Sequence, residues 1–127
     1  MSEMSATASS DKHIYHVTSR ADWDQAQSVG VYNWSTRGKS LEEVGFIHAS
    51  MANQLPATAE FVYGGCDDEL VVLVMDLDKL DAVGLTVRFE AADNGKSYPH
   101  IYAPLPCHLV DDVRPAAFND QGAFSLI

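Results

Sequence analysis

Leu70-Val71-Val72-Leu73-Val74-Met75 is an uninterrupted apolar run, and acidic residues precede and follow it at positions 67–69 and 76. A run this short, without polar alternation, is typical of a strand that is buried on both faces. It is the clearest element in the sequence. We therefore expect residues 70–75 to form a central strand against which other parts of the chain pack.

Two elements are predicted at the start of the folded part. Residues 13–17 are rich in aromatic and β-branched side chains, which indicates a strand. A helix follows, because Ser19 can cap its N-terminus and Gly30 can end it. The residues on one face of the strand are Ile14, His16 and Thr18. The apolar stripe of the helix is Trp23, Ala26 and Val29.

The segment before the central strand begins with a short turn and a short strand. Ser40 with Glu43 is a capping signature and predicts a helical turn that ends at Gly45. The residues that follow, Phe46-Ile47-His48-Ala49, indicate a strand.

A second helix is predicted over residues 51–63, with Ser50 positioned as its N-cap. Pro56 lies inside this span, and an interior proline removes a hydrogen bond. We therefore expect the helix to be interrupted or restarted there, and Gly64-Gly65 to end it.

Strands dominate the sequence after the central strand. Residues 76–81 indicate a turn, residues 85–90 indicate a half-buried strand, and Asn94-Gly95 is a strong turn signal. Residues 98–102 and 109–113 indicate short strands, the first of them at a sheet edge. The order β-α-β-α followed by several strands predicts an α+β fold.

Length and composition indicate one globular domain. The chain has 127 residues, of which 46% are hydrophobic and 20% charged, too apolar a mixture for a disordered protein. Residues 1–11 are small and polar without periodicity. We expect a disordered leader there and a single domain over residues 12–127.

The charge balance excludes some classes of binding partner. Eight lysines and arginines against 18 aspartates and glutamates give a formal net charge of -10. Duplex nucleic acid and membrane headgroups both need a cationic field, so neither is an expected partner. A cytoplasmic protein is expected, because no apolar run is long enough to span a bilayer and no signal pattern is present. Cys66 and Cys107 form no CxxC motif and are expected to be free thiols.

The tripeptide Gly38-Lys39-Ser40 is similar to part of a phosphate-binding loop, but Asn33 stands where that motif requires glycine. Arg37 and Lys39 still make this loop the densest cationic part of the chain, and both anion binding and a solvated loop remain open. The histidines and cysteines lack zinc-site spacing, so no metal site is expected.

Histidines are the informative polar residues, because imidazole donates and accepts hydrogen bonds and titrates near neutral pH. His16, His48 and His100 each lie in a predicted strand beside a hydroxyl-bearing residue. One such histidine alone would more often be a half-buried structural residue. Three of them in a small domain predict a shared cleft.

Three sequence blocks resemble domain of unknown function family 952, a family of small bacterial proteins without an established activity. They are HIYHVTSRADW at residues 13–23, GFIHASMANQ at residues 45–54 and YPHIYAPLP at residues 98–106. The sequence departs from the family at Ala103, where glycine is usual, and at Pro56, within a helix that is usually uninterrupted.

The resemblance implies an ADP-ribosyltransferase-like fold, in which split antiparallel sheets with two main helices hold NAD in a cleft. It implies that His16 is similar to a first-strand histidine that contacts the nicotinamide ribose. His48-Ala49-Ser50 resembles the His-x-Ser strand end of RNA 2′-phosphotransferases. Glu90 is the one candidate for a catalytic glutamate and does not match the transferase position clearly. A shared fold does not by itself transfer an activity.

These expectations combine into a protein that binds NAD, ADP-ribose or a related nucleotide in a histidine-lined cleft, with transferase-type chemistry left open. The expected catalytic residues are His48 and His100. The expected ligand-binding residues are His16, Thr18, Arg20, Arg37, Ser50 and Tyr102. Two alternatives stay open: a non-catalytic interaction module with structural histidines, and a hydrolase of a small metabolite.

Overall fold

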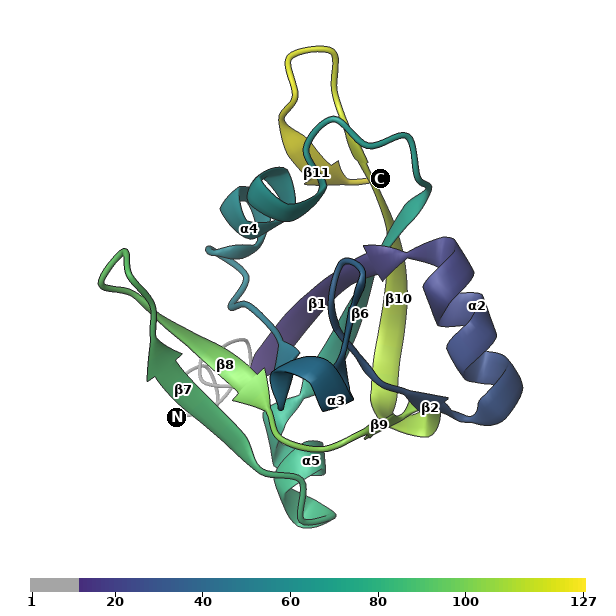
Figure 1. Cartoon of the computed structure of the whole chain (residues 1–127), viewed down its shortest axis with the longest axis vertical. Helices are drawn as coiled ribbons and strands as arrows, with labels where there is room; N and C mark the ends of the chain where they lie inside the picture. The colour runs from purple at the N-terminus through teal and green to yellow at the C-terminus, as the bar shows by residue number, and fades with distance from the viewer. Residues whose placement is uncertain (1–11) are drawn as a thin grey trace, which may run out of the picture.

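A four-stranded antiparallel sheet forms the centre of the protein, in the strand order β1-β6-β10-β11 (Figure 1). The computed structural model describes residues 12–127, and the predicted leader at residues 1–11 lies outside the described part of the chain. The strands of this sheet are β1 (His13–Ser19), β6 (Leu70–Asp76), β10 (Val110–Phe118) and β11 (Phe124–Leu126). The predicted strand at residues 109–113 is thus longer than expected and continues into a C-terminal hairpin.

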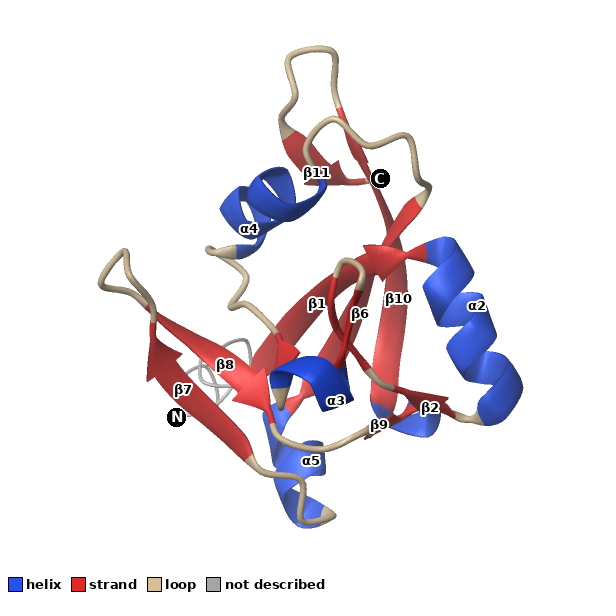
Figure 2. Ribbon diagram, in the orientation of Figure 1, coloured by secondary structure: helices blue, strands red, loops and turns tan. Residues whose placement is uncertain are grey.

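Strand β6 lies between β1 and β10 and is buried on both faces, as its apolar run predicts. Leu73 belongs to a hydrophobic cluster on one face, and Val72 belongs to a second cluster on the other. Helix α2 (Arg20–Val29) contributes Trp23 and Ala26 to the first cluster. Helix α4 (Leu55–Tyr63) contributes Leu55, Ala59 and Tyr63 to the second. The two helices therefore cover opposite faces of the sheet (Figure 2).

The first two predicted helix starts are confirmed by their caps. Ser19 Oγ accepts a hydrogen bond from Asp22 N at 3.1 Å at the start of α2. Ser40 and Glu43 form the complete capping box of α3 (Leu41–Val44). The prediction for the end of the α2 stripe is wrong, since Val29 is 68% exposed. It lies on the last turn of the helix, beyond the reach of the sheet.

The predicted N-cap of the second helix is wrong, whereas the predicted restart beside Pro56 is confirmed, because residues 52–54 form a turn before the helix begins. Helix α4 begins at Leu55, so Pro56 lies in the first turn, where its missing N–H breaks no hydrogen bond. Ser50 is instead joined to Tyr15 of β1 by a β-bridge. Its hydroxyl donates to Thr58 Oγ1 at 3.1 Å.

A second antiparallel sheet has the order β5-β8-β7. It consists of β5 (Ile47–His48), β7 (Val87–Ala91) and β8 (Ser97–Ile101). Strand β8 was expected at an edge because of Pro99, but it is the central strand. Pro99 has no N–H to donate, yet its carbonyl accepts a hydrogen bond from Ala49 N at 3.0 Å. The strand can therefore be paired on both sides despite the proline.

Small elements connect the two sheets. They are the strand pair β2 (Val31–Tyr32) and β9 (Leu105–Pro106), the pair β3 (Trp34–Thr36) and β4 (Lys39–Ser40), helix α5 (Leu77–Ala82) and a 3-10 turn at Cys107–Leu109. Helices and antiparallel sheets together confirm the α+β class. Within residues 12–127, none of the helices has the length and apolar character needed to cross a membrane.

Candidate functional site

A cavity of about 840 Å³ is enclosed by parts of both sheets and by helix α4. Strands β1 and β5 contribute His16 and His48, and the β7–β8 hairpin contributes its turn, Tyr98 and His100. Helix α4 contributes several side chains, including the exposed Phe61. The three histidines selected from the sequence therefore line one cavity, which we call the histidine cavity.

The pairing of β5, β8 and β7 explains why polar side chains gather on one face of this sheet. His48 and Arg88 are the Cα partners of His100 on its two sides. Because side chains alternate along a strand, residues two positions away share this face. They are Phe46, Glu90 and Tyr102. The intervening residues Ile47, Ile101 and Val87 contact the hydrophobic core on the other face.

His100 is held by a carboxylate. Its Nδ1 lies 2.7 Å from Glu90 Oε1, and the Tyr102 hydroxyl donates to the same oxygen. The hydrogen bonds from Tyr102 and His100 lower the pKa of Glu90, so this group is a carboxylate at neutral pH. A ring whose Nδ1–H is fixed in this way presents Nε2 to its surroundings.

His48 is held by a neutral hydroxyl instead. Its Nδ1 is hydrogen-bonded to the buried Ser35 Oγ at 3.0 Å. Burial, and next the neighbouring His100, lower the pKa of His48 below its usual value. The Phe46 ring stacks on His100 with centroids 4.0 Å apart and also contacts His48. Within residues 12–127, the Nε2 atoms of His48 and His100 both lack a hydrogen-bond partner.

His16 uses both ring nitrogens inside the protein. Its Nδ1–H donates to the His48 carbonyl, which can only accept. The Tyr32 hydroxyl lies 2.7 Å from Nε2. Burial lowers the pKa of His16 to about 4, so the ring is neutral and accepts this hydrogen bond. His16 therefore links β1 to β5, and it has no ring nitrogen left for a ligand.

The other residues that the sequence predicts to bind a ligand do not all lie at the histidine cavity. Ser50 lines the cavity but is 1% exposed. Tyr102 does not line it, and its hydroxyl donates to Glu90, the carboxylate that holds His100. Thr18 is buried outside the cavity lining, and its hydroxyl has no hydrogen-bond partner in the described chain.

The two arginines lie at a separate hollow of about 540 Å³. Arg20 Nε pairs with Glu69 at 2.8 Å, and Arg37 donates to the Val62 carbonyl at 3.1 Å. Among the described residues, no lysine or arginine lines the histidine cavity. Its one charged lining residue is Asp93 on the hairpin turn.

Several site residues were missed by sequence reasoning. Phe46 lies two residues before His48, so strand alternation would have placed it beside the histidine. The Asn94-Gly95 turn would have placed residues 88–90 opposite residues 98–100, and Glu90 near His100. No local signal marks Ser35 or Tyr32, because both come from short strands after a loop.

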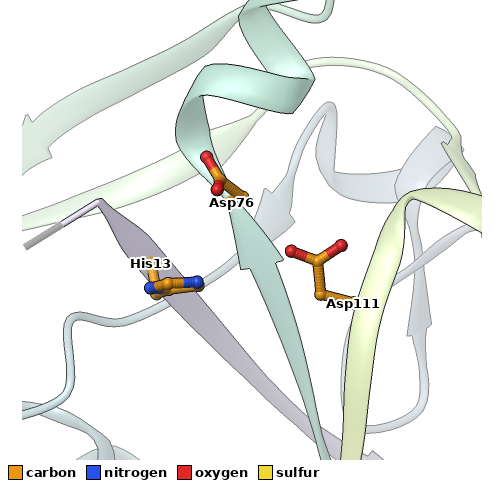
Figure 3. A group of neighbouring side chains, drawn as sticks. All are labelled: His13, Asp76 and Asp111. Carbon is orange, nitrogen blue, oxygen red and sulfur yellow. The ribbon is translucent and has the colours of Figure 1, made fainter. Parts of the chain in front are cut away.

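A second cluster lies at the ends of β1, β6 and β10, where His13, Asp76 and Asp111 offer ligand atoms within 4.8 Å of one another (Figure 3). Its carboxylates have local roles. Asp76 Oδ1 accepts from Asp78 N at 2.8 Å and caps α5, while Asp111 pairs with Lys79 at 2.7 Å. We assign no metal ion to this cluster.

A comparison with protein-family models finds a match that contains the second and third sequence blocks, at residues 45–54 and 98–106. The family model described as a protein of unknown function, DUF952, matches residues 17–113. No curated protein matches the chain.

The solved structures similar to this chain include those of a protein from Caulobacter crescentus. The crystal structure of protein CC0527 has a TM-score of 0.76 and 30% identity, and the match covers 89% of this chain and 93% of that one. Its solution NMR structure has a TM-score of 0.71 and 29% identity over 88% and 90% of the two chains. These relatives support the fold and carry no stated activity.

Proposed function

This chain belongs to the DUF952 family of proteins of unknown function, and we propose that it binds a nucleotide-type ligand in the histidine cavity. The ligand class is NAD, ADP-ribose or a related nucleotide. One observation carries the proposal: His48 and His100 lie side by side on an otherwise largely apolar cavity, each with one ring nitrogen held by the protein. The free Nε2 atoms would contact the polar groups of the ligand.

The cavity suits the nucleoside part of such a ligand better than its phosphates. Its volume lies within the roughly 300–1,000 Å³ typical of small-molecule pockets. Phe61 and Tyr98 offer aromatic surface for a planar base. No lysine or arginine lines the described cavity wall, so a pyrophosphate would extend towards solvent.

An ADP-ribosyltransferase-like arrangement is part of this proposal. Strands from both sheets border the same cavity, which is the arrangement that a cleft between split sheets requires. In this reading His48 and His100 are the catalytic residues. Glu90 acts behind His100, because it does not line the cavity.

NMR titration tests the binding. We expect millimolar ADP-ribose or NAD to shift backbone amide signals of residues around the cavity. His100→Ala should weaken binding by about fivefold or more, as expected for the loss of one net hydrogen bond. His108→Ala is the matched control, since His108 is exposed and lies outside the cavity lining.

Two results would contradict the proposal. One is the absence of shifts from either ligand while the protein remains folded, which would favour an interaction module. The other is a set of shifts confined to the hollow beside Arg20 and Arg37.

A further inference from the structure

The two cavity imidazoles have unequal surroundings. Their ring centroids are 5.3 Å apart in an edge-to-face arrangement. His100 contacts the Glu90 carboxylate, whereas His48 contacts a neutral hydroxyl. A negative charge next to a ring stabilises its protonated form, and two protonated rings this close repel each other. The carboxylate beside His100 therefore suits that ring to donate a proton, and the neutral hydroxyl beside His48 suits that ring to accept one.

We propose that the histidine cavity hydrolyses a phosphodiester of a nucleotide, with His48 as the general base and His100 as the general acid. This inference rests on the proposed function for the nucleotide part of the substrate. Pairs of titratable groups that differ in this way divide the acid and base roles of a reaction between them.

The reaction needs only water as a co-reactant. A water O–H proton passes to His48 Nε2 while the water oxygen forms a bond to phosphorus. The ester P–O bond breaks, and its electron pair stays on the leaving oxygen. That oxygen takes the proton from His100 Nε2, so the products are an alcohol and a phosphomonoester. Afterwards His48 loses a proton to solvent and His100 regains one.

The charge in the cavity matches a diester. A phosphodiester is a monoanion, and the protonated His100 supplies one positive charge. A phosphomonoester or pyrophosphate carries more negative charge, which the described cavity wall does not balance because Asp93 is its other charged group. A reaction stabilised by a carboxylate next to the substrate is less well supported, because Glu90 lies behind His100.

The charged groups around the pair determine its pH dependence. Glu90 and Arg88 face His100 from β7, and the Arg88 guanidinium lies 5.2 Å from the centre of the Tyr102 ring. His48 faces His100 from β5, and Asp93 lies on the hairpin turn. The rate should follow a bell-shaped pH profile, because activity requires a neutral His48 and a protonated His100.

The test is hydrolysis of bis(4-nitrophenyl) phosphate and of 2′,3′-cyclic AMP by the full chain. His48→Ala should lower the rate on both substrates by roughly 100-fold or more, the usual contribution of one acid or base. His100→Ala should do so on 2′,3′-cyclic AMP, whose alkoxide leaving group needs a proton, and should have a smaller effect on the nitrophenyl ester, whose phenolate leaves without one. Glu90→Gln keeps the hydrogen bond but removes the charge, so the alkaline limb of the profile should move to lower pH. His108→Ala should retain the rate and the profile of the original chain.

Each outcome supports or overturns this proposal. Loss of cyclic AMP turnover in both histidine variants, with the shifted limb in Glu90→Gln, supports it. Absence of turnover of both diesters, or equal rates of cyclic AMP hydrolysis in the histidine variants and the original chain, overturns it. If NAD or ADP-ribose still shifts the cavity signals in that case, nucleotide binding stands without hydrolysis. Turnover without such shifts overturns the binding proposal instead.

Discussion

At the scale of single residues, His16 shows how a candidate ligand contact becomes part of the structure. Its two hydrogen bonds connect the carbonyl of His48 with the hydroxyl of Tyr32, both distant in sequence. Burial raises the pKa of Tyr32, which therefore remains a neutral donor. The His16 ring therefore holds the β5 backbone beneath the cavity through its Nδ1–H, and only its contact with Tyr32 requires a neutral imidazole.

The first prediction follows from the pKa of His16. The unfolded chain binds a proton at this histidine near pH 6.5, whereas the folded chain binds one only near pH 4. The neutral form therefore contributes stability above pH 6.5 that is lost as the pH falls towards 4, about 3 kcal/mol in all. Urea denaturation measured from pH 6.5 to pH 4 should show that the free energy of unfolding falls more steeply in the original chain than in His16→Phe. If the free energy of unfolding changed equally with pH in the two proteins, His16 would not be the buried neutral histidine described here.

The second prediction concerns the partner of His16. Tyr32→Phe removes the donor to Nε2 and leaves a buried acceptor without a partner, which should cost roughly 1–3 kcal/mol. Tyr98→Phe is the control, because within residues 12–127 the Tyr98 hydroxyl bonds only to Asn94 in the exposed hairpin. This change should alter stability by less than about 0.5 kcal/mol. Thermal denaturation of both variants measures the two losses of stability, and the melting temperature of Tyr32→Phe should fall further. An equal, small effect would show that the His16 contact is weak.

At the scale of elements, the cavity is bordered by a helix and a hairpin that other contacts hold in place. Gln54 Nε2 donates to the Ser97 carbonyl at 2.8 Å, and Gln54 Oε1 accepts from Met51 N at 2.9 Å. This side chain joins the segment before α4 to the start of β8. At the other end of α4, Glu60 accepts a hydrogen bond from Phe124 N at 2.9 Å and joins the helix to β11.

The third prediction concerns the end of α4. A Cβ at position 64 would lie 2.4 Å from the Glu60 carbonyl oxygen, a contact that forces the backbone to move. Gly64→Ala should therefore destabilise the protein by roughly 1–3 kcal/mol, as overpacked sites do. Asp67→Ala, an exposed change just beyond the same turn, should leave the urea midpoint nearly unchanged. A Gly64→Ala midpoint equal to that of the original chain would refute the steric reason.

At the scale of the whole molecule, one hydrophobic cluster joins the two sheets. It contains Leu73 and Met75 of β6 together with Ile47 of β5 and Ile101 of β8. The face of β5-β8-β7 that carries the histidines is opposite to the face in this cluster. The position of the cavity therefore depends on packing beneath it, and the site and the core cannot move independently.

The fourth prediction tests this dependence. Leu73→Ala and Ile101→Ala both remove fully buried side chains from the shared cluster and should cost roughly 2–5 kcal/mol each. Phe61→Ala is the control at the cavity mouth, since Phe61 is 91% exposed, and its effect on stability should be below about 0.5 kcal/mol. Urea denaturation followed by both near- and far-ultraviolet circular dichroism measures these costs. The two signals should change in one shared transition; separate transitions would show that secondary structure persists after the tertiary packing is lost, so that unfolding is not a single cooperative step.

Features that depend on neighbouring residues can be predicted from the sequence alone. The run at residues 70–75 predicted a strand buried on both faces, and the caps of α2 and α3 lie where Ser19 and Ser40 indicated. These predictions succeed because an uninterrupted apolar run or a capping hydroxyl acts within a few residues. The same reasoning selected His16, His48 and His100 as residues of one cleft.

Which of these residues have free functional groups depends on contacts between elements that are distant in sequence. Strand alternation tells which side chains share a face, but it does not tell which strand lies next to it. Pairing across long sequence separations placed β8 in the centre of its sheet and Tyr32 on the second nitrogen of His16. It also placed Arg20 and Arg37 at a different hollow. Such contacts arise from the packing of the whole core, so no local pattern encodes them.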